Sequence, residues 1–329
     1  MSLHALRHAL RLPNLLALTA ALLIVGDAAA QGSADWPNKP VRIIVNFGPG
    51  GSADNSMRPF AERLSKALGQ QFVIENRGGA SGALGIEGMT KSAPDGYTFV
   101  ITPALSVIIL PHLRKTPYDP LVDLVPVTAI TNGTLLFAVH PSVQANSVQE
   151  VAAFAKQNPG KLSWGTAGVG SMGHIMAELF KSAAGVEVLH VPYRGGGESL
   201  ADFLAGVVQI HADANTFPHI AAGKAKLLAV VDRSRHPDYP NVPLLKEIYP
   251  DIDFLGWFGV FAPVGTPDAI VRKFAAEMTK IGKDPELVTL LRKTALAPTA
   301  GQPEELAAML KKDHAFFGAI IKKLNMKAE

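Results

Sequence analysis

Residues 45–60 read VNFGPGGSADNSMRPF, and this stretch joins an apolar strand pattern to a helical pattern through a Gly-Pro-Gly-Gly turn. Glycine allows backbone conformations that are closed to other residues and lets another molecule approach the main chain. Ser52 and Asp54 are residue types favoured at helix N-caps, and apolar residues follow at helical spacing up to Leu68. Free N–H groups and the positive end of the helix dipole should therefore face the space beyond the turn. A small anion would fit there, although a tight turn alone would use the same residues.

A second unit of the same kind follows in mid-chain, where residues 164–180 read WGTAGVGSMGHIMAELF. In both places a strand pattern leads through a glycine-rich loop into a helical pattern. Open α/β sheets bind ligands where helix N-termini lie beyond the carboxyl ends of strands. Two such ends facing one another would form a ligand-binding cleft.

Short apolar, β-rich runs alternate with helical patterns through most of the chain. This alternation predicts βαβ units and an α/β fold, with mostly parallel sheets and helices on both faces. The expected strands are 41–47, 72–74, 97–102, 135–139, 162–165, 188–191, 208–212 and 227–231. After residues 254–261 only helical patterns follow, beginning at Pro267, Pro285 and Pro303. Because this last block has no sheet of its own, we expect it to pack on the first half, with two crossings between the halves.

The expected organisation has two lobes and a separate N-terminal segment. We assign residues 31–132 and 254–329 to lobe 1 and residues 133–253 to lobe 2, with hinges near residues 131–134 and 254–257. In residues 1–30, Arg7 and Arg11 precede an apolar run, and three alanines before Gln31 offer an A-x-A cleavage site. This segment is typical of a signal peptide and predicts export to a periplasm.

The composition is that of a soluble globular chain of 329 residues, 48% hydrophobic and 18% charged. Residues 1–30 contain two arginines and one aspartate, so removing them reduces the 31 basic and 28 acidic residues to 29 and 27. This near-neutral balance gives no indication of nucleic-acid binding. The absence of cysteine excludes disulfides, thiol catalysis and cysteine metal sites.

The motifs of several enzyme and cofactor classes are incomplete. Residues 168–173 match G-x-G-x-x-G, but Glu187 begins the following strand instead of ending it, which disfavours a dinucleotide site. Neither glycine-rich loop has a Walker A lysine, and the G-x-S-x-G elbow of serine hydrolases is missing. Ser171 and His174 are more typical of a helix cap with a packed neighbour than of a catalytic pair. No histidine pattern provides a complete metal-ligand set, so we predict no catalysis, no cofactor and no metal.

Six motifs are distributed from the first glycine-rich turn to the C-terminal third of the chain. They are PGGSAD at 49–54, VIENRGGASG at 73–82, APDGYTF at 93–99, TAGVGSMGH at 166–174, HVPYRGGGESLADFLAG at 190–206 and FGVFAPVGTP at 258–267. Together they resemble the periplasmic solute-binding proteins of tripartite tricarboxylate transporters, the Bordetella uptake gene (Bug) family. The resemblance covers nearly the whole chain after the signal peptide, and it is specific because the motifs occur together.

The resemblance implies a two-lobed Venus-flytrap fold of the type II binding-protein kind, in which backbone N–H groups and ordered water hold a ligand carboxylate. The holding loops correspond to residues 47–54 and 166–174. The sequence departs from the family pattern at Asn46, Gly48 and residues 102–104 and 211–219, which line the expected pocket and bear on the identity of the ligand. The candidate ligand-binding residues are Phe47, Gly50, Gly51, Ser52, Asp54, Thr102, Ala104, Thr166, Ala167, Gly170, Ser171, His174, Arg194, Asp213 and Asn215.

We interpret the chain as a monomeric, non-catalytic receptor that binds a small organic carboxylate. It would deliver this ligand to the membrane permease subunits of a tripartite tricarboxylate-type transporter. The alternatives are an enzyme on the same scaffold, with Ser171 or His174 as chemical groups, and a receptor that serves a signalling sensor. Because Arg194 is the one cation near a pocket motif, we expect a mono- or dicarboxylate with a compact apolar or aromatic body and rank citrate lower.

Overall fold

The computed structural model describes residues 35–294, 296–323 and 326. The predicted signal peptide, residues 1–30, lies outside the described residues. The chain divides into a short unit, Met1–Asn38, and a large unit, Lys39–Glu329, which holds all the strands and helices named below. Within the described part of the chain, we find no helix that combines the length and the apolar character needed to cross a bilayer.

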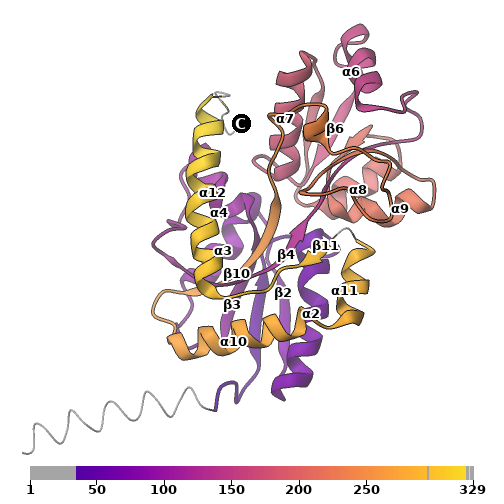
Figure 1. Ribbon diagram of the computed structural model, residues 1–329. Helices are drawn as coiled ribbons and strands as arrows, with labels where there is room; N and C mark the ends of the chain where they lie inside the picture. The colour runs from indigo at the N-terminus through magenta and orange to yellow at the C-terminus, as the bar shows by residue number, and fades with distance from the viewer. Residues whose placement is uncertain (1–34, 295, 324–325, 327–329) are drawn as a thin grey trace, which may run out of the picture. The chain divides into compact units, whose positions relative to one another are not determined.

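The first sheet of the large unit has six strands in the order β11-β4-β10-β3-β1-β2 (Figure 1). Its strands are β1 (Val41–Val45), β2 (Phe72–Asn76), β3 (Thr98–Pro103), β4 (Leu124–Gly133), β10 (Gly256–Pro263) and β11 (Leu296–Pro298). The helices that pack on it include α2 (Ser52–Leu68), α3 (Ala83–Thr90), α4 (Leu105–Ile108), α10 (Asp268–Ile281) and α12 (Pro303–Lys323). We call this sheet and its helices the first lobe.

The second sheet has five strands in the order β7-β6-β8-β5-β9. Its strands are β5 (Leu135–Val139), β6 (Ser163–Thr166), β7 (Leu189–Pro192), β8 (Ile210–His211) and β9 (Lys226–Val231). Helices α7 (Met172–Ala184) and α8 (Gly196–Leu204) pack against β6. We call this sheet and its helices the second lobe. The remaining helices are α5 (Leu110–Leu113), α6 (Val148–Gln157), α9 (Phe217–Ala221) and α11 (Pro285–Arg292), with short 3-10 turns at Ala80–Gly82, Ala214–Thr216 and Leu245–Glu247.

The α/β class and the two-lobed fold are confirmed, but the prediction of mostly parallel sheets is wrong. Among the strand pairings of the described residues, β1 with β2 and β3, and β6 with β7 and β8, are parallel. The other five pairings are antiparallel. Two of these five pairings follow from the return crossing, since β10 enters the first sheet from the opposite end and runs against both β3 and β4.

Two strands were not expected from the sequence. Strand β4 contains Pro126 and ends at Asn132-Gly133, residue types that usually interrupt a strand, and its ladder with β10 has two register shifts. Strand β11 lies in the C-terminal block, which we expected to contain only helices after β10. It pairs with β4 from Leu296 to Pro298, so this block adds an edge strand to the first sheet.

The chain leaves the first lobe at the end of β4 and returns at the start of β10. Gly133 pairs with Gly256 at this point, and a Cβ on Gly256 would lie 3.1 Å from the Gly133 carbonyl oxygen. The next residue, Trp257, is almost fully buried, and its indole N–H donates to Asp313 of α12 at 2.9 Å. The two crossings therefore lie against one another and are tied to the C-terminal helix.

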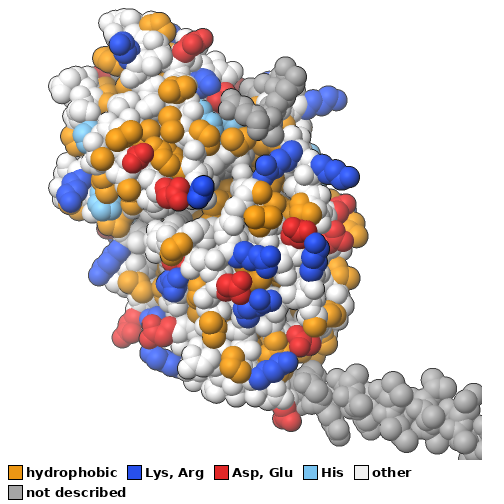
Figure 2. Space-filling view, turned by 180° about the vertical axis from the view of Figure 1, so that it is seen from behind, with side chains coloured by type: hydrophobic (Ala, Val, Ile, Leu, Met, Phe, Trp, Pro, Cys, Tyr) orange, Lys and Arg blue, Asp and Glu red, His pale blue; other side chains and the backbone are white. Residues whose placement is uncertain are grey.

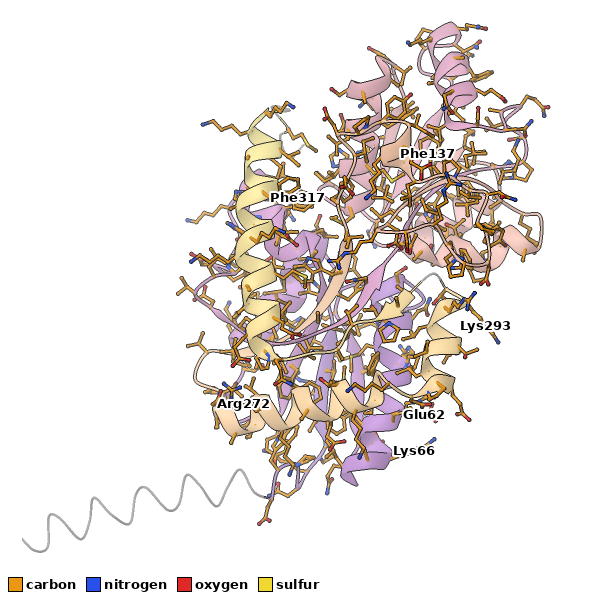
Figure 3. All side chains as sticks on the ribbon, in the orientation of Figure 1. Glu62, Lys66, Phe137, Arg272, Lys293 and Phe317 are labelled. Carbon is orange, nitrogen blue, oxygen red and sulfur yellow. The ribbon has the colours of Figure 1, made fainter. Side chains whose placement is uncertain are left out.

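Aromatic side chains fill the core of each lobe. In the second lobe, the Phe137 ring packs edge-on against Trp164 and Phe180, each with a ring-centre distance of 5.0 Å. In the first lobe, Phe317 of α12 packs edge-on against Phe254 at 5.8 Å (Phe137 and Phe317 are labelled in Figure 3). These buried rings anchor the elements that carry the loops described below.

Neighbouring phenylalanines of α12 provide a matched test of this packing. Phe317 is 2% exposed and Phe316 is 47% exposed. Phe317→Ala should lower the free energy of unfolding by about 3 to 5 kcal/mol, because it empties a closed apolar space. Phe316→Ala should lower it by less than about 1 kcal/mol. Urea unfolding followed by circular dichroism measures both, and equal losses would contradict the described orientation of α12.

Candidate ligand-binding site

A cavity of about 80 Å³ lies between the two lobes. A cavity needs about 10 to 15 Å³ to hold one water molecule. This cavity therefore has room for a small organic molecule. The first lobe contributes Phe47, Gly51, Ser52, Ala53, Pro103, Leu105 and Phe258, and the second contributes Leu135, Gly165, Thr166, Ala167, Ser171, Met172, Gly173, Gly196, Ala212, Asp213 and Ala214. Gly133, Thr134, Gly256 and Trp257, from the two crossings, close its remaining side.

The first glycine-rich loop brings the N-terminus of α2 to this cavity. Gly51 is the N-cap and has no side chain to cap the helix. Ser52, expected as a cap, is instead the first helical residue, and its hydroxyl donates to the Asp213 carboxylate of the second lobe. The start of α2 therefore lines the cavity, and the N-cap residue offers no side-chain acceptor to the N–H groups of its first turn.

Asp54 does not line the cavity, although the sequence analysis placed it among the ligand-binding residues. Its carboxylate is buried and accepts hydrogen bonds from Gly50 N–H at 3.0 Å, Arg58 Nε at 2.7 Å and Asn76 Nδ2 at 2.9 Å. Burial raises the pKa of Asp54, but these hydrogen bonds outweigh burial and leave the pKa below its usual value. Asp54 therefore shapes the glycine-rich turn from behind.

The second loop brings the N-terminus of α7 to the same cavity. Ser171 is the N-cap, and its Oγ accepts from the His174 backbone N–H at 3.1 Å. Gly170 has a φ of +79° and donates its N–H to His174 Nδ1 at 3.0 Å. Because the Gly170 N–H already has this acceptor, and neither Gly170 nor His174 lines the cavity, both residues hold the loop in shape.

A pair of stacked histidines supports this loop. The His174 and His190 rings lie 4.0 Å apart and within 9° of parallel. His190 Nε2 lies 2.7 Å from the hydroxyl of Thr166, a residue that lines the cavity. Burial, with a smaller contribution from Lys181, lowers the pKa of His174 to about 4, and burial together with His174 lowers that of His190 to about 3. Both rings are therefore neutral at neutral pH.

A third helix N-terminus, that of α8, also reaches the cavity. Its N-cap is Gly195, and its first residue, Gly196, lines the cavity. A Cβ on Gly196 would lie 2.4 Å from Asp213 Oδ2, so no larger residue fits here. Asp213 Oδ1 accepts from the Ser52 hydroxyl and from the Asn215 N–H at 3.1 Å. Among the described residues that line the cavity, Asp213 is the one with a charged side chain.

The structure brings together about half of the predicted ligand-binding residues. Those that line the cavity are Phe47, Gly51, Ser52, Thr166, Ala167, Ser171 and Asp213. Those that do not are Gly50, Asp54, Thr102, Ala104, Gly170, His174, Arg194 and Asn215. Thr102 accepts from Asn46 Nδ2 at 2.8 Å, and Ala104 donates its N–H to the Trp257 carbonyl at 2.8 Å, so both support the wall.

The sequence analysis did not select several lining residues, among them Met172, Gly173 and Gly196. Gly173 is close-packed, since a Cβ there would lie 3.4 Å from the Ala212 methyl. The run of three glycines at 195–197 is the sequence signal that points to Gly196, whereas the prediction named the neighbouring Arg194. Arg194 is exposed and lines a separate, adjacent cavity.

Comparison with known proteins agrees with this arrangement. The family model described as the tripartite tricarboxylate transporter family receptor matches residues 56–326. The protein BugT of Bordetella pertussis is 30% identical over 326 residues, which cover 97% of this chain and 99% of BugT. The structure of R. palustris Rpa4515 with adipate has a TM-score of 0.85 at 33% identity, covering 89% of this chain and 99% of that one. The periplasmic binding protein BugD has a TM-score of 0.84 at 29% identity, with coverages of 89% and 100%.

The histidine pair predicts a pH dependence of stability. Because the pKa of folded His174, about 4, lies below its ordinary value of 6.5, protons bind the unfolded chain more readily. The stability contributed by neutral His174 is complete above pH 6.5 and is lost as the pH falls toward 4. In His174→Gln, the free energy of unfolding should therefore fall less steeply as the pH is lowered, by up to about 1.4 kcal/mol per pH unit. Urea unfolding at pH 7, 6 and 5 measures the slopes, and identical slopes would contradict the buried, neutral ring.

Proposed function

Because this chain belongs to the tripartite tricarboxylate transporter receptor family, we propose that it binds a small organic carboxylate in the cavity between its lobes. The observation that carries this proposal is the convergence of the N-termini of α2, α7 and α8 on one cavity. Backbone N–H groups and helix dipoles favour an anion at such a point. Among the described residues that line the cavity there is no lysine or arginine that would serve instead.

The cavity favours a ligand with one inner carboxylate and a compact apolar body. Phe47, Leu105 and Trp257 line it beside the helix N-termini, so an apolar body has surfaces to contact. Hydrogen bonds to a charged group contribute about 1.5 to 3 kcal/mol each, and micromolar affinity needs about 8 kcal/mol, so a few N–H donors suffice. A tricarboxylate such as citrate would place further charges near Asp213, so we rank it lower.

We propose that binding closes the two lobes around the ligand. Residues 31–132 and 254–329 would move as one body and residues 133–253 as the other, with hinges at residues 131–134 and 254–257. Two hydrogen bonds join the lobes beside the cavity: Ser52 donates to Asp213, and Ser81 Oγ donates to the Val169 carbonyl at 3.0 Å. Both hydrogen bonds form only when the lobes lie close together, which supports the proposed closure.

We place the protein in the periplasm as a monomeric, non-catalytic receptor that hands its ligand to membrane permease subunits. The family consists of periplasmic solute receptors. The hydrogen bonding of Ser171 and His174 supports the absence of catalysis. His174 Nδ1 accepts from the Gly170 N–H, and Ser171 Oγ accepts from the His174 backbone N–H, so the ring does not activate the hydroxyl. On the face shown in Figure 2, Lys and Arg side chains lie interspersed with Asp and Glu side chains.

Substitution of Gly51 tests the proposed site. Gly51→Val should weaken carboxylate binding at least about 100-fold, because the added methyl groups enter the cavity at the α2 N-terminus, where the N–H donors lie. Gly48→Val is the matched control: it lies in the same loop, and a Cβ there meets nothing within 4 Å. Calorimetric titration with benzoate, hexanoate and adipate measures both variants, and circular dichroism checks their folding. Failure of the unmodified protein to bind any acid, or unchanged affinity of Gly51→Val, would contradict the proposal.

Closure predicts a measurable change in size. Small-angle X-ray scattering of the ligand-free protein should give a larger radius of gyration than the protein saturated with a bound acid, because hinge opening separates the lobes. Ser52→Ala removes one hydrogen bond between the lobes. The radius of gyration of this variant without ligand should be equal to or larger than that of the unmodified protein without ligand. Identical scattering with and without saturating ligand would indicate a rigid pocket.

A further inference from the structure

A second cavity of about 270 Å³ adjoins the first one and is also formed by both lobes. The first lobe contributes residues 79–81, Leu110 and Arg114, and the second contributes residues 167–169 and 192–194. Ala167 lines both cavities, which places the two next to one another in the structure. An extended ligand anchored in the first cavity would have to pass this small residue to reach the second.

Two arginines that form no ion pair with the described acidic residues line this second cavity. Of the ten arginines in the described part of the chain, Arg42, Arg58, Arg63, Arg235, Arg272 and Arg292 form ion pairs. The other four are Arg77, Arg114, Arg194 and Arg233, and two of these, Arg114 and Arg194, line the same cavity. The Glu198 carboxylate accepts from the backbone N–H of Arg194 at 3.3 Å, which leaves the guanidinium group to other partners.

The wall that faces these arginines is held in an unusual backbone conformation. Ala80 and Ser81 have φ values of +51° and +52°, a left-handed conformation that is rare for residues other than glycine. Arg114 Nη2 donates to the Ala80 carbonyl at 2.5 Å, and Ser81 Oγ donates to the Val169 carbonyl at 3.0 Å. Strained residues fixed by their surroundings cluster at ligand sites. The cavity is thus a shaped site rather than a gap between mobile loops.

We propose that Arg114 and Arg194 bind the outer carboxylate of a dicarboxylate whose inner carboxylate occupies the first cavity, an inference that rests on the proposed function. Guanidinium groups bind carboxylates through paired hydrogen bonds. Asp213 lines the first cavity and not the second, so the outer carboxylate is placed away from the acid. Because Arg114 belongs to the first lobe and Arg194 to the second, a carboxylate held by both also favours closure.

The test compares acids of equal carbon number that differ in one end group. Hexanoate, heptanoate and octanoate share their chains with adipate, pimelate and suberate. Calorimetric titration should show that the unmodified protein binds at least one dicarboxylate about 10-fold or more tightly than its monocarboxylate partner. In Arg194→Gln that advantage should fall below about threefold, while monocarboxylate affinity stays within about twofold.

Two further variants test whether the dicarboxylate advantage depends on the position of the positive charge and on the paired guanidinium donors. Lys115→Gln removes an exposed cation next to Arg114 that does not line the cavity, and it should leave the dicarboxylate advantage unchanged. Arg194→Lys keeps the charge without the paired donors, and it should retain part of the advantage. Arg114 is not the primary target, because its hydrogen bond to Ala80 supports the strained loop.

The outcomes distinguish this inference from the proposed function. Binding of monocarboxylates with no dicarboxylate advantage, or an advantage that survives Arg194→Gln, would overturn the second subsite and leave the first cavity in place. An equal loss for both acid classes in Arg194→Gln would also overturn it, since the arginine would then act on closure in general. Binding of neither class to the unmodified protein would overturn the proposed function itself.

Discussion

The N–H groups in the first turns of α2, α7 and α8 have no carbonyl partner within their own helices. Apart from the His174 N–H, which the Ser171 hydroxyl caps, they need acceptors once water leaves the space between the lobes. This requirement organises the structure around the cavity. Glycine at positions 51 and 196 leaves the backbone of α2 and α8 uncovered by side chains. Strands β1 and β6 position the N-termini of α2 and α7 at the same cavity. Under the proposed function, the acceptor oxygens of a carboxylate would meet this requirement when the lobes close, which would couple ligand binding to closure.

The residues behind the cavity explain why two glycine-rich loops keep one shape. Asp54 accepts three hydrogen bonds behind the first loop. His174 Nδ1 accepts a hydrogen bond from the Gly170 N–H behind the second. Each loop thus rests on a buried polar group that does not line the cavity. Such support holds donors in position before the ligand arrives, so less ordering remains to be done on binding.

Local patterns predicted the parts of the fold that local chemistry decides. The strand, glycine loop and helix units at β1-α2 and β6-α7 are confirmed, as is family membership, because turn residues and helical spacing lie within a short window. Strands β4 and β11 were missed, since pairing with β10 and β4 outweighs Pro126 and the short length of β11. Arg114 could not be assigned to any site, because only the folded chain brings it to the cavity of Arg194, eighty positions later.

Trp257 links the ligand cavity to the C-terminal helix. Trp257 lines the cavity, while its indole N–H donates a hydrogen bond to Asp313 of α12 at 2.9 Å. An apolar ligand that replaces water changes the medium on one face of the ring, whereas the hydrogen bond keeps the other edge fixed. Under the proposed function, a ligand in the cavity would change the surroundings of this indole, so the fluorescence of Trp257 would serve as an optical signal of occupancy.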